Sequence, residues 1–402
     1  MERLYDKLKA YSESDFYAFH MPGHKRNKTL LGIELPYDLD ITEIDGFDDL
    51  HHADGILKEE QERAARVFGA EESHFLVNGS TAGILSAVMG CTHRGDKILV
   101  ARHCHKSIYH AIYMNGLVPR YVYPEFDISM HMNGEISKED VAKALAAEPD
   151  IKAVVIVSPN YDGVVSDVKG IAEVAHSYRI PLIVDEAHGP HFGFHPAFPG
   201  RANDLGADVV INSLHKTLPS LTQTAILHIN GKLANRRRIK KYLDMLQSSS
   251  PSYIFMASLD ACVDFLDGKC ENAFELYVER LQKFREELEP LQHLQILRTE
   301  HYDISKVVIS TANANITSPE LADRLRKEYH LEMEMTGGTY VLAMTTVADT
   351  QEGLDRLKSA LLEIDGQLEA KTAVSGSIEI SGELPRLEQY FTPQEAADRE
   401  ED

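Results

Sequence analysis

The sequence contains no tryptophan in its 402 residues, so no indole ring can shape a binding pocket. Long apolar runs are absent as well. The longest stretches, such as residues 153–157 and 182–184, have the length of a strand and are far too short to span a bilayer. The N-terminus lacks the cationic and apolar pattern of a signal peptide. These absences predict a cytoplasmic protein with no membrane association.

Cysteine and basic residues are also scarce. The four cysteines form no CxxC pair and no metal-like spacing, which indicates free thiols in a reducing compartment. Lys and Arg number 41 against 63 Asp and Glu, a net charge of −22. Without a basic excess to neutralise phosphates, the composition excludes nucleic acid as a partner. A negative field favours a cationic substrate or product instead.

The first 250 residues divide into an arm and a region of alternating strands and helices. Residues 1–50 are irregular beyond a short amphipathic stretch, and we interpret them as an N-terminal arm. From 51 to 250, helical spacing such as Ile56–Phe68 alternates with apolar runs of strand length. Such runs are typical of the buried, mainly parallel sheet of an α/β domain. The predicted strands are Ile98–Ala101, Val154–Ser158, Leu182–Asp185, Val209–Asn212 and Ala225–Ile229.

Residues 251–402 have a different pattern. One long helix is predicted over Leu259–Leu288, followed by a strand at Val307–Ser310. A further helix begins at Ser318, and another strand covers Tyr340–Met344. From about residue 371 the sequence is polar and poorly periodic. This part is predicted to be a smaller α+β C-terminal domain.

Small and hydroxyl residues mark one predicted helix start. Asn78 is followed by Gly79, Ser80 and Thr81, ahead of an apolar helix. A buried helix start of this kind exposes backbone N–H groups that can bind an anion such as a phosphate. An ordinary hydroxyl N-cap is an equally good interpretation of this segment alone.

An acidic cluster follows the predicted strand at residues 182–185. Asp185 at its end could pair with a protonated ring nitrogen or bind a metal. His188, His191 and His195 follow closely, which at first suggests a metal site. However, no HExxH motif is present, and the glycines with Pro190 break any helix that would align the imidazoles. No metal is therefore predicted.

Two further clusters carry a lysine and a histidine. Lys216 lies just after the strand at 209–212, between Ser213 and Thr217. A lone lysine is usually structural, but a desolvated one can form a Schiff base. His105 follows the strand at 98–101 and could stack on a flat cofactor or transfer a proton. A solvated histidine at a helix start is the simpler interpretation of His105 alone.

The order of these clusters resembles that of an aspartate-aminotransferase-like, fold type I enzyme that uses pyridoxal 5'-phosphate. In that order a phosphate loop comes first, then a ring-stacking histidine, an aspartate at a strand end and a lysine. The resemblance implies a mainly parallel seven-stranded sheet flanked by helices. Asp185 would keep the pyridine nitrogen protonated so that the ring acts as an electron sink, and Lys216 would carry the aldehyde.

Longer motifs make the resemblance more specific and extend it along nearly the whole chain. They resemble the Orn/Lys/Arg decarboxylase family in its short, Gram-positive type. The motifs lie at residues 20–25, 40–44, 48–51, 68–70, 78–81, 105–107, 161–163, 185–189, 213–217, 221–223 and 247–253. The implied reaction is decarboxylation of a basic L-amino acid (arginine, lysine or ornithine) to CO₂ and agmatine, cadaverine or putrescine.

The resemblance also implies roles for individual residues. Lys216, His105 and Asp185 are the implied catalytic residues, and His188 would lie beside the cofactor ring. The implied phosphate contacts are Gly79, Ser80, Thr81, Ser213 and His215, with Ser249 and Ser250 reaching the site of a neighbouring subunit. A homodimer or a larger assembly with shared active sites follows from this.

One departure and several alternatives accompany the resemblance. The sequence ends where family members usually continue into a further C-terminal segment, so that segment is expected to be absent here. Another fold type I reaction, by an aminotransferase or a lyase, is the first alternative. A non-catalytic subunit that binds the cofactor or a partner chain is the second. The carboxylates that could select the substrate by its length are Asp162, Asp303 and Glu334.

Overall fold

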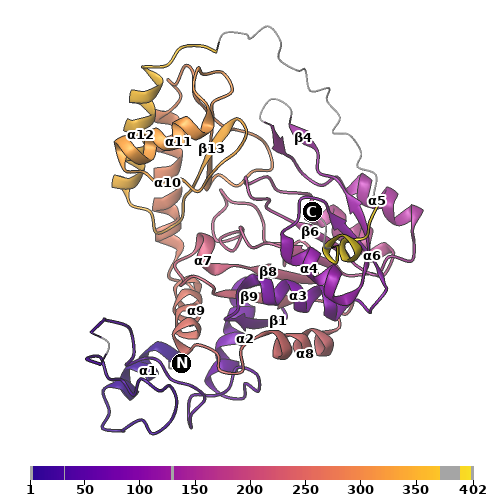
Figure 1. Ribbon diagram of the computed structural model, residues 1–402, viewed down its shortest axis with the longest axis vertical. Coiled ribbons are helices and arrows are strands. Elements are labelled where there is room, and N and C mark those ends of the chain that lie inside the picture. Colours follow the sequence, from indigo (N-terminus) through magenta and orange to yellow (C-terminus); the bar gives the residue numbers. More distant parts are fainter. Residues whose placement is uncertain (1–2, 31, 128–130, 372–389, 400–402) are drawn as a thin grey trace.

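The computed structural model describes residues 3–30, 32–127, 131–371 and 390–399 (Figure 1). Its largest element within these ranges is a seven-stranded sheet with the strand order β1-β9-β8-β7-β6-β2-β3. All neighbouring strands are parallel except β9, which is antiparallel to both β1 and β8. The predicted mainly parallel α/β sheet is therefore confirmed. The strands are β1 (Glu72–Leu76), β2 (Lys97–Ala101), β3 (Val118–Val122), β6 (Val154–Val157), β7 (Leu182–Asp185), β8 (Val209–Asn212) and β9 (Ala225–Ile229).

Helices cover both faces of this sheet, which explains the continuous apolar runs. Val155 packs into a core with α3, α4 and α8, whereas Val154 and Ile156 pack into a core with α5 and α6. Because successive side chains of a strand point to opposite faces, both sets of positions must be apolar. The helices around the sheet are α2 (Ile56–Phe68), α3 (Gly79–Cys91), α4 (Lys106–Asn115), α5 (Lys138–Ala147), α6 (Val168–Ser177), α7 (Leu214–Thr217) and α8 (Arg236–Leu246).

A second, smaller sheet follows in the chain and lies at the upper left of Figure 1. Within the described residues its strand order is β10-β11-β13-β12, with β11 and β13 antiparallel. The strands predicted at 307–310 and 340–344 are confirmed as β11 and β13. The elements are β10 (Gln295–Ile296), β11 (Lys306–Ser310), β12 (Met335–Thr336), β13 (Tyr340–Met344), α11 (Ser318–Tyr329) and α12 (Gln351–Asp365).

The single long helix predicted over Leu259–Leu288 is wrong. The structure has two helices here, α9 (Tyr253–Leu266) and α10 (Glu271–Glu287). Gly268 between them has a φ of 75°, a left-handed conformation that ends the first helix. The apolar spacing continues on both sides of this turn because both helices face the same core, and for that reason the sequence pattern conceals the break.

The remaining elements lie at the edges of the fold. The strands β4 (Phe126–Asp127) and β5 (Met132–Asn133) pair antiparallel, and α13 (Pro393–Ala397) packs near α4. Most of the polar stretch predicted after residue 371 lies outside the described residues. The division into an arm (1–50), a large domain (51–250) and a small domain (251–402) stays a prediction from the sequence.

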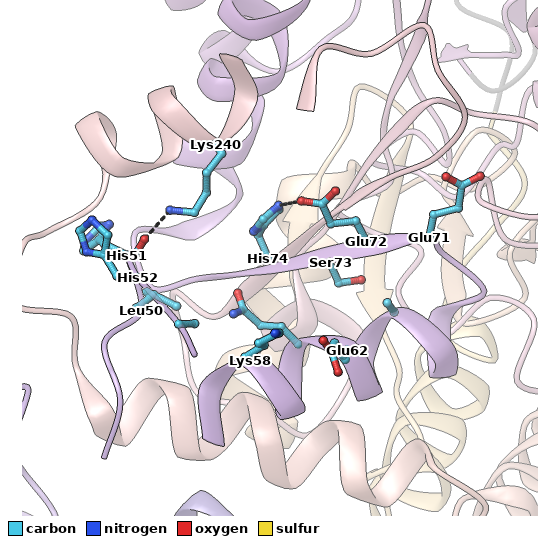
Figure 2. A pocket seen from close by; sticks show the side chains of 13 residues that line it. Leu50, His51, His52, Lys58, Glu62, Glu71, Glu72, Ser73, His74 and Lys240 are labelled. Atoms are coloured by element: carbon cyan, nitrogen blue, oxygen red, sulfur yellow. Dashed lines mark hydrogen bonds and ion pairs between the residues drawn. The ribbon is translucent and has the colours of Figure 1, made fainter. Parts of the chain in front are cut away.

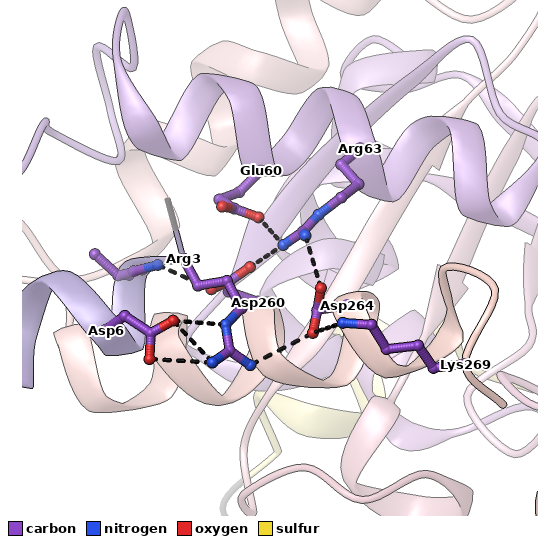
Figure 3. Close-up of polar contacts among 8 residues, drawn as sticks. Arg3, Asp6, Glu60, Arg63, Asp260, Asp264 and Lys269 are labelled. Carbon is purple, nitrogen blue, oxygen red and sulfur yellow. Dashed lines mark hydrogen bonds and ion pairs between the residues drawn. The ribbon is translucent and has the colours of Figure 1, made fainter. Parts of the chain in front are cut away.

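The first helix of the described chain is α1 (Leu4–Ser12), within the predicted arm; it packs on α9 through the buried side chains of Leu4 and Leu8. Charged residues tie these helices together (Figure 3). Arg63 of α2 contacts Glu60 and Asp260, both with fully buried side chains. Asp260 also accepts a hydrogen bond from the Leu4 backbone N–H at 3.0 Å. We call Arg3, Glu60, Arg63, Asp260 and Asp264 the arm cluster.

Candidate active site

The site lies where parallel strands of the large sheet end. β7 ends at Asp185 and β8 at Asn212, and the register places Asp185 beside Ile211. Ligands of open α/β sheets bind beyond the carboxyl ends of such strands. Lys216 follows β8 in the single turn of α7, so the chain brings Asp185 and Lys216 to one edge.

Asp185 is buried, with 3% of its surface exposed. Its Oδ1 accepts a hydrogen bond from the Ala187 backbone N–H at 3.2 Å. Burial raises the pKa of Asp185, while the nearby charge of Lys216 and this hydrogen bond act in the opposite direction. A buried carboxylate of this kind is stabilised by a cationic partner such as a protonated ring nitrogen.

Lys216 is half-buried, and its Nζ lies 3.0 Å from Nε2 of His188. Burial lowers its pKa, and the negative charges of Asp185 and Glu334 raise it. A lysine with a lowered pKa has a larger neutral fraction at a given pH, and the neutral amine is the nucleophile. The structure thus brings Lys216, Asp185 and His188 into one region.

His188 is buried between two lysines. Its Nε2 faces Lys216, and its Nδ1 lies 3.0 Å from Nζ of Lys306. The ring of Tyr161 lies 4.7 Å from the imidazole, centroid to centroid. Burial, followed by the charges of Lys306 and Lys216, lowers the pKa of His188 well below its ordinary value, so the ring is neutral.

The predicted phosphate loop begins α3. Gly79 has a φ of 73°, and a Cβ added there would approach only the Gln223 carbonyl oxygen, at 3.9 Å. The loop at residues 248–250 lies against this helix start, since the Ser248 N–H donates to the Asn78 side chain at 3.0 Å. Ser249 and Ser250 are exposed. Ser80 and Thr81 occupy the first turn of the helix, where backbone N–H groups lack helical partners.

Ser213 and His215 flank the start of α7. The hydroxyl of Ser213 is buried and has no hydrogen-bond partner among the described residues. Such an unsatisfied polar atom is costly unless a ligand or water satisfies it. Nδ1 of His215 lies 2.9 Å from the Thr224 carbonyl oxygen, which leaves Nε2 for another partner. Both residues therefore fit a site for a polar group.

His105 is the N-cap residue of α4. Its Nδ1 accepts the backbone N–H of Ser107 and lies 2.8 Å from the Ser107 hydroxyl. Burial, followed by the charge of Lys216, lowers its pKa. The electrostatic influence of Lys216 on His105, and of His105 on His188, shows that the three side chains share one region.

The proposed pocket carboxylates differ in their surroundings. Asp162 is buried and accepts a hydrogen bond from the Tyr340 hydroxyl at 2.5 Å. Asp303 is buried and bound to Ser305 and His191. Glu334 is exposed and accepts a hydrogen bond from the Tyr161 hydroxyl. Glu334 therefore has the most accessible carboxylate of the three.

The sequence did not predict Lys306 as a site residue. It begins β11 in the second sheet, 118 residues from His188, and its side chain is wholly buried. No local motif surrounds it, and a lysine before an apolar strand is usually solvated. Only the packing of the two sheets, which no pattern in the sequence expresses, places its amine in the site.

The described chain also has a pocket away from this site. The pocket drawn in Figure 2 lies between α2, β1 and Lys240, and none of its lining residues belongs to the predicted site. In it, Lys240 donates to the His51 carbonyl oxygen at 2.7 Å, and His74 pairs with Glu72. Among the described residues, no group of three or more His, Cys, Asp or Glu side chains could hold a metal ion. No helix in the described ranges is long and apolar enough to cross a membrane.

Solved structures share this fold. A lysine decarboxylase of Francisella novicida superposes with a TM-score of 0.78 at 20% identity, covering 90% of this chain and 60% of that chain. An alanine–glyoxylate aminotransferase of Nostoc superposes with a TM-score of 0.62 at 15% identity. The chain thus spans about 60% of the length of the solved lysine decarboxylase. These neighbours have the fold of type I enzymes, and the predicted fold class is confirmed.

Sequence comparisons identify the family. An arginine decarboxylase of Bacillus subtilis is 34% identical over 98% of this chain and 83% of its own length. One of Halalkalibacterium halodurans is 34% identical over 90% of this chain and 76% of its own length. The family described as "Orn/Lys/Arg decarboxylase, major domain" matches residues 3–364. The chain therefore belongs to the Orn/Lys/Arg decarboxylase family, which is a family of enzymes.

Proposed function

We propose that this protein removes CO₂ from a basic L-amino acid with the help of pyridoxal 5'-phosphate. The observation that carries the proposal is the meeting of Lys216, His188 and Asp185 at the strand ends, beside a helix start suited to a phosphate. The named activity of the Bacillus subtilis relative supports arginine as the first substrate to test. Lysine and ornithine remain the other candidates.

The residues present fit this cofactor. Gly79 leaves open space at the start of α3, and the buried Ser213 hydroxyl lacks a partner among the described residues. Gly79, Ser80, Thr81, Ser213 and His215 would hold the phosphate. Ser249 and Ser250 would contact the phosphate in a neighbouring subunit's site, which makes a homodimer part of the proposal. The cytoplasmic location stays a prediction from the sequence.

Each remaining residue has a separate task. When bound, the cofactor supplies an electron sink for the carbanion left by CO₂. The Asp185 carboxylate would hold a proton on the ring nitrogen, which its buried position favours because the charges compensate each other. Lys216 would carry the cofactor on Nζ, and His105 would stack on the ring. His105 or Lys216 would return a proton to the substrate carbon.

The charge of the protein fits a cationic substrate. Its net charge of −22 attracts arginine, lysine or ornithine in the encounter step. Glu334 is exposed and near enough to influence Lys216, so it is the carboxylate we propose to meet the distal cation of the substrate. Asp162 and Asp303 are buried and bonded within the protein, whereas Glu334, although bonded to Tyr161, stays exposed.

The test is product identification. The purified chain, loaded with pyridoxal phosphate, is given each basic amino acid, and CO₂ and amine are measured. Lys216→Ala is expected to abolish CO₂ release and the visible absorbance of the protein-bound cofactor, while Lys241→Ala, at an exposed lysine of α8, changes neither. Keto-acid formation would favour the aminotransferase alternative. Cofactor binding without any product would favour a non-catalytic subunit.

A further inference from the structure

Two amines face opposite nitrogens of one buried imidazole. Nζ of Lys216 lies 3.0 Å from Nε2 of His188, and Nζ of Lys306 lies 3.0 Å from Nδ1. A neutral imidazole has one N–H donor and one acceptor, whereas an ammonium group can only donate. Both lysines therefore cannot be ammonium groups that donate to a neutral His188 at the same time.

Two arrangements give both ring nitrogens of His188 a matching hydrogen-bond partner. In the first, the Lys306 ammonium donates to Nδ1, and the Nε2–H of His188 donates to the neutral amine of Lys216. In the second, the Lys216 ammonium donates to Nε2, and the Nδ1–H donates to the neutral amine of Lys306. The two differ by one shift of a proton at each ring nitrogen. The imidazole is neutral in both, and the total charge of the three residues is the same.

Lys306 is held rigidly for this role. Its backbone N–H donates to the Asp303 carbonyl oxygen at 3.1 Å, and its own carbonyl oxygen accepts from Arg285 and Tyr302 at 2.9 Å. The aliphatic stem packs on Gly163, where an added Cβ would lie 2.8 Å from Cγ of Lys306. A fixed backbone and a packed stem keep the amine at the imidazole, as a preorganised site requires.

The charges around the three residues permit either arrangement. Burial lowers the pKa of Lys306 to about 8, and Asp303, Glu334 and Asp162 limit that decrease. Burial also lowers the pKa of Lys216, against Asp185 and Glu334. His105 and His215 face His188 as well and disfavour a charged imidazole. Burial therefore favours the neutral form of both amines.

We propose that Lys306 exchanges one proton with Lys216 through the two ring nitrogens of His188. The Lys306 ammonium gives a proton to Nδ1 while Nε2 gives its own to the Lys216 amine; the reverse shift restores the first arrangement. Lys306 is thus a positioning residue that acts through His188 and sets how much of Lys216 is neutral. One consequence rests on the proposed function: the exchange would supply Lys216 with the proton that it returns to the substrate carbon.

The experiment uses the full chain without added cofactor, so that it is independent of turnover. A trace of an amine-acylating reagent labels the half-exposed Lys216 at a series of pH values, and mass spectrometry gives the midpoint of its reactivity. Lys306→Met removes the second charge and frees Nε2 to accept from Lys216. The midpoint is expected to rise by about one pH unit.

Lys306→Arg provides the opposite change. A guanidinium does not give up its proton, so it holds His188 in the form whose Nε2–H faces Lys216. The midpoint is then expected to equal or fall below that of the unchanged protein. Midpoints that stay within about 0.3 units in both variants, or that rise in both, would overturn the proposal. Circular dichroism checks folding. If only one variant folds, an unchanged or lowered midpoint in Lys306→Met, or a raised midpoint in Lys306→Arg, overturns the proposal. Absent CO₂ release in the earlier assay would refute the function without altering this result.

Discussion

Arg63 lies at the centre of the arm cluster, and its replacement tests how the N-terminal arm is held. Arg63→Ala leaves the fully buried Asp260 without its cation and removes the hydrogen-bond donor of the fully buried Glu60 (Figure 3). Removing one partner of a buried ion pair costs about 3–5 kcal/mol, because the other charge stays buried. For a chain of 402 residues, the average unfolding entropy per residue converts this cost to a decrease of about 5 °C in melting temperature.

Differential scanning calorimetry measures this decrease. Arg326→Ala is the matched control, because Arg326 pairs with Asp323 on the exposed surface of α11. Exposed pairs contribute little, so the control is expected to melt within about 1 °C of the unchanged protein. If Arg63→Ala also melts within about 1 °C, the buried charges are not held as the structure indicates, and the reasoning fails.

The same cluster predicts a dependence of stability on pH. Burial, followed by the hydrogen bond and charge of Asp260, raises the pKa of Glu60 to about 8 from its ordinary value of 4.5. The folded protein thus favours protonated Glu60. This contribution to stability is fully present below pH about 4.5 and is lost as the pH rises through about 8. Glu60→Gln is expected to reduce the decrease in melting temperature between pH 6 and pH 9; an unchanged slope would contradict the raised pKa.

Two further variants test the site and the packing. Asp185→Asn is expected to retain bound cofactor but to lower turnover at least about a hundredfold, since the ring nitrogen loses its carboxylate; turnover within about threefold of the unchanged enzyme would dismiss the role. Gly90→Ala places a Cβ 2.9 Å from the Ile239 backbone. It is expected to destabilise the α3–α8 contact by about 1–3 kcal/mol in urea unfolding, whereas an unaltered midpoint would show that the helices can separate freely.

The buried strands of the large sheet could be predicted because their surroundings are uniform. Helices cover both faces, so the strands at Leu182–Asp185 and Val209–Asn212 are apolar up to their last residue, and the structure has these bounds. The edge strands β1 and β3 were not predicted. In β1, Glu72 and His74 are only partly buried, so this strand has no continuous apolar run. In β3, Pro119 interrupts the apolar pattern. An edge strand has fewer neighbours, so its sequence is less constrained.

Lys216 and Lys306 show where prediction of a site from sequence ends. Lys216 follows a strand of the large sheet directly, and its neighbours Ser213 and His215 lie in the same turn, so a local motif indicates its place. Lys306 reaches the same imidazole from another sheet, and its position depends on how β11 packs against the loop at Gly163. Local patterns encode the strand and the residue type, but a contact between sheets is a property of the packed fold. Lys306, which contacts Nδ1 of His188, could therefore be found only in the structure.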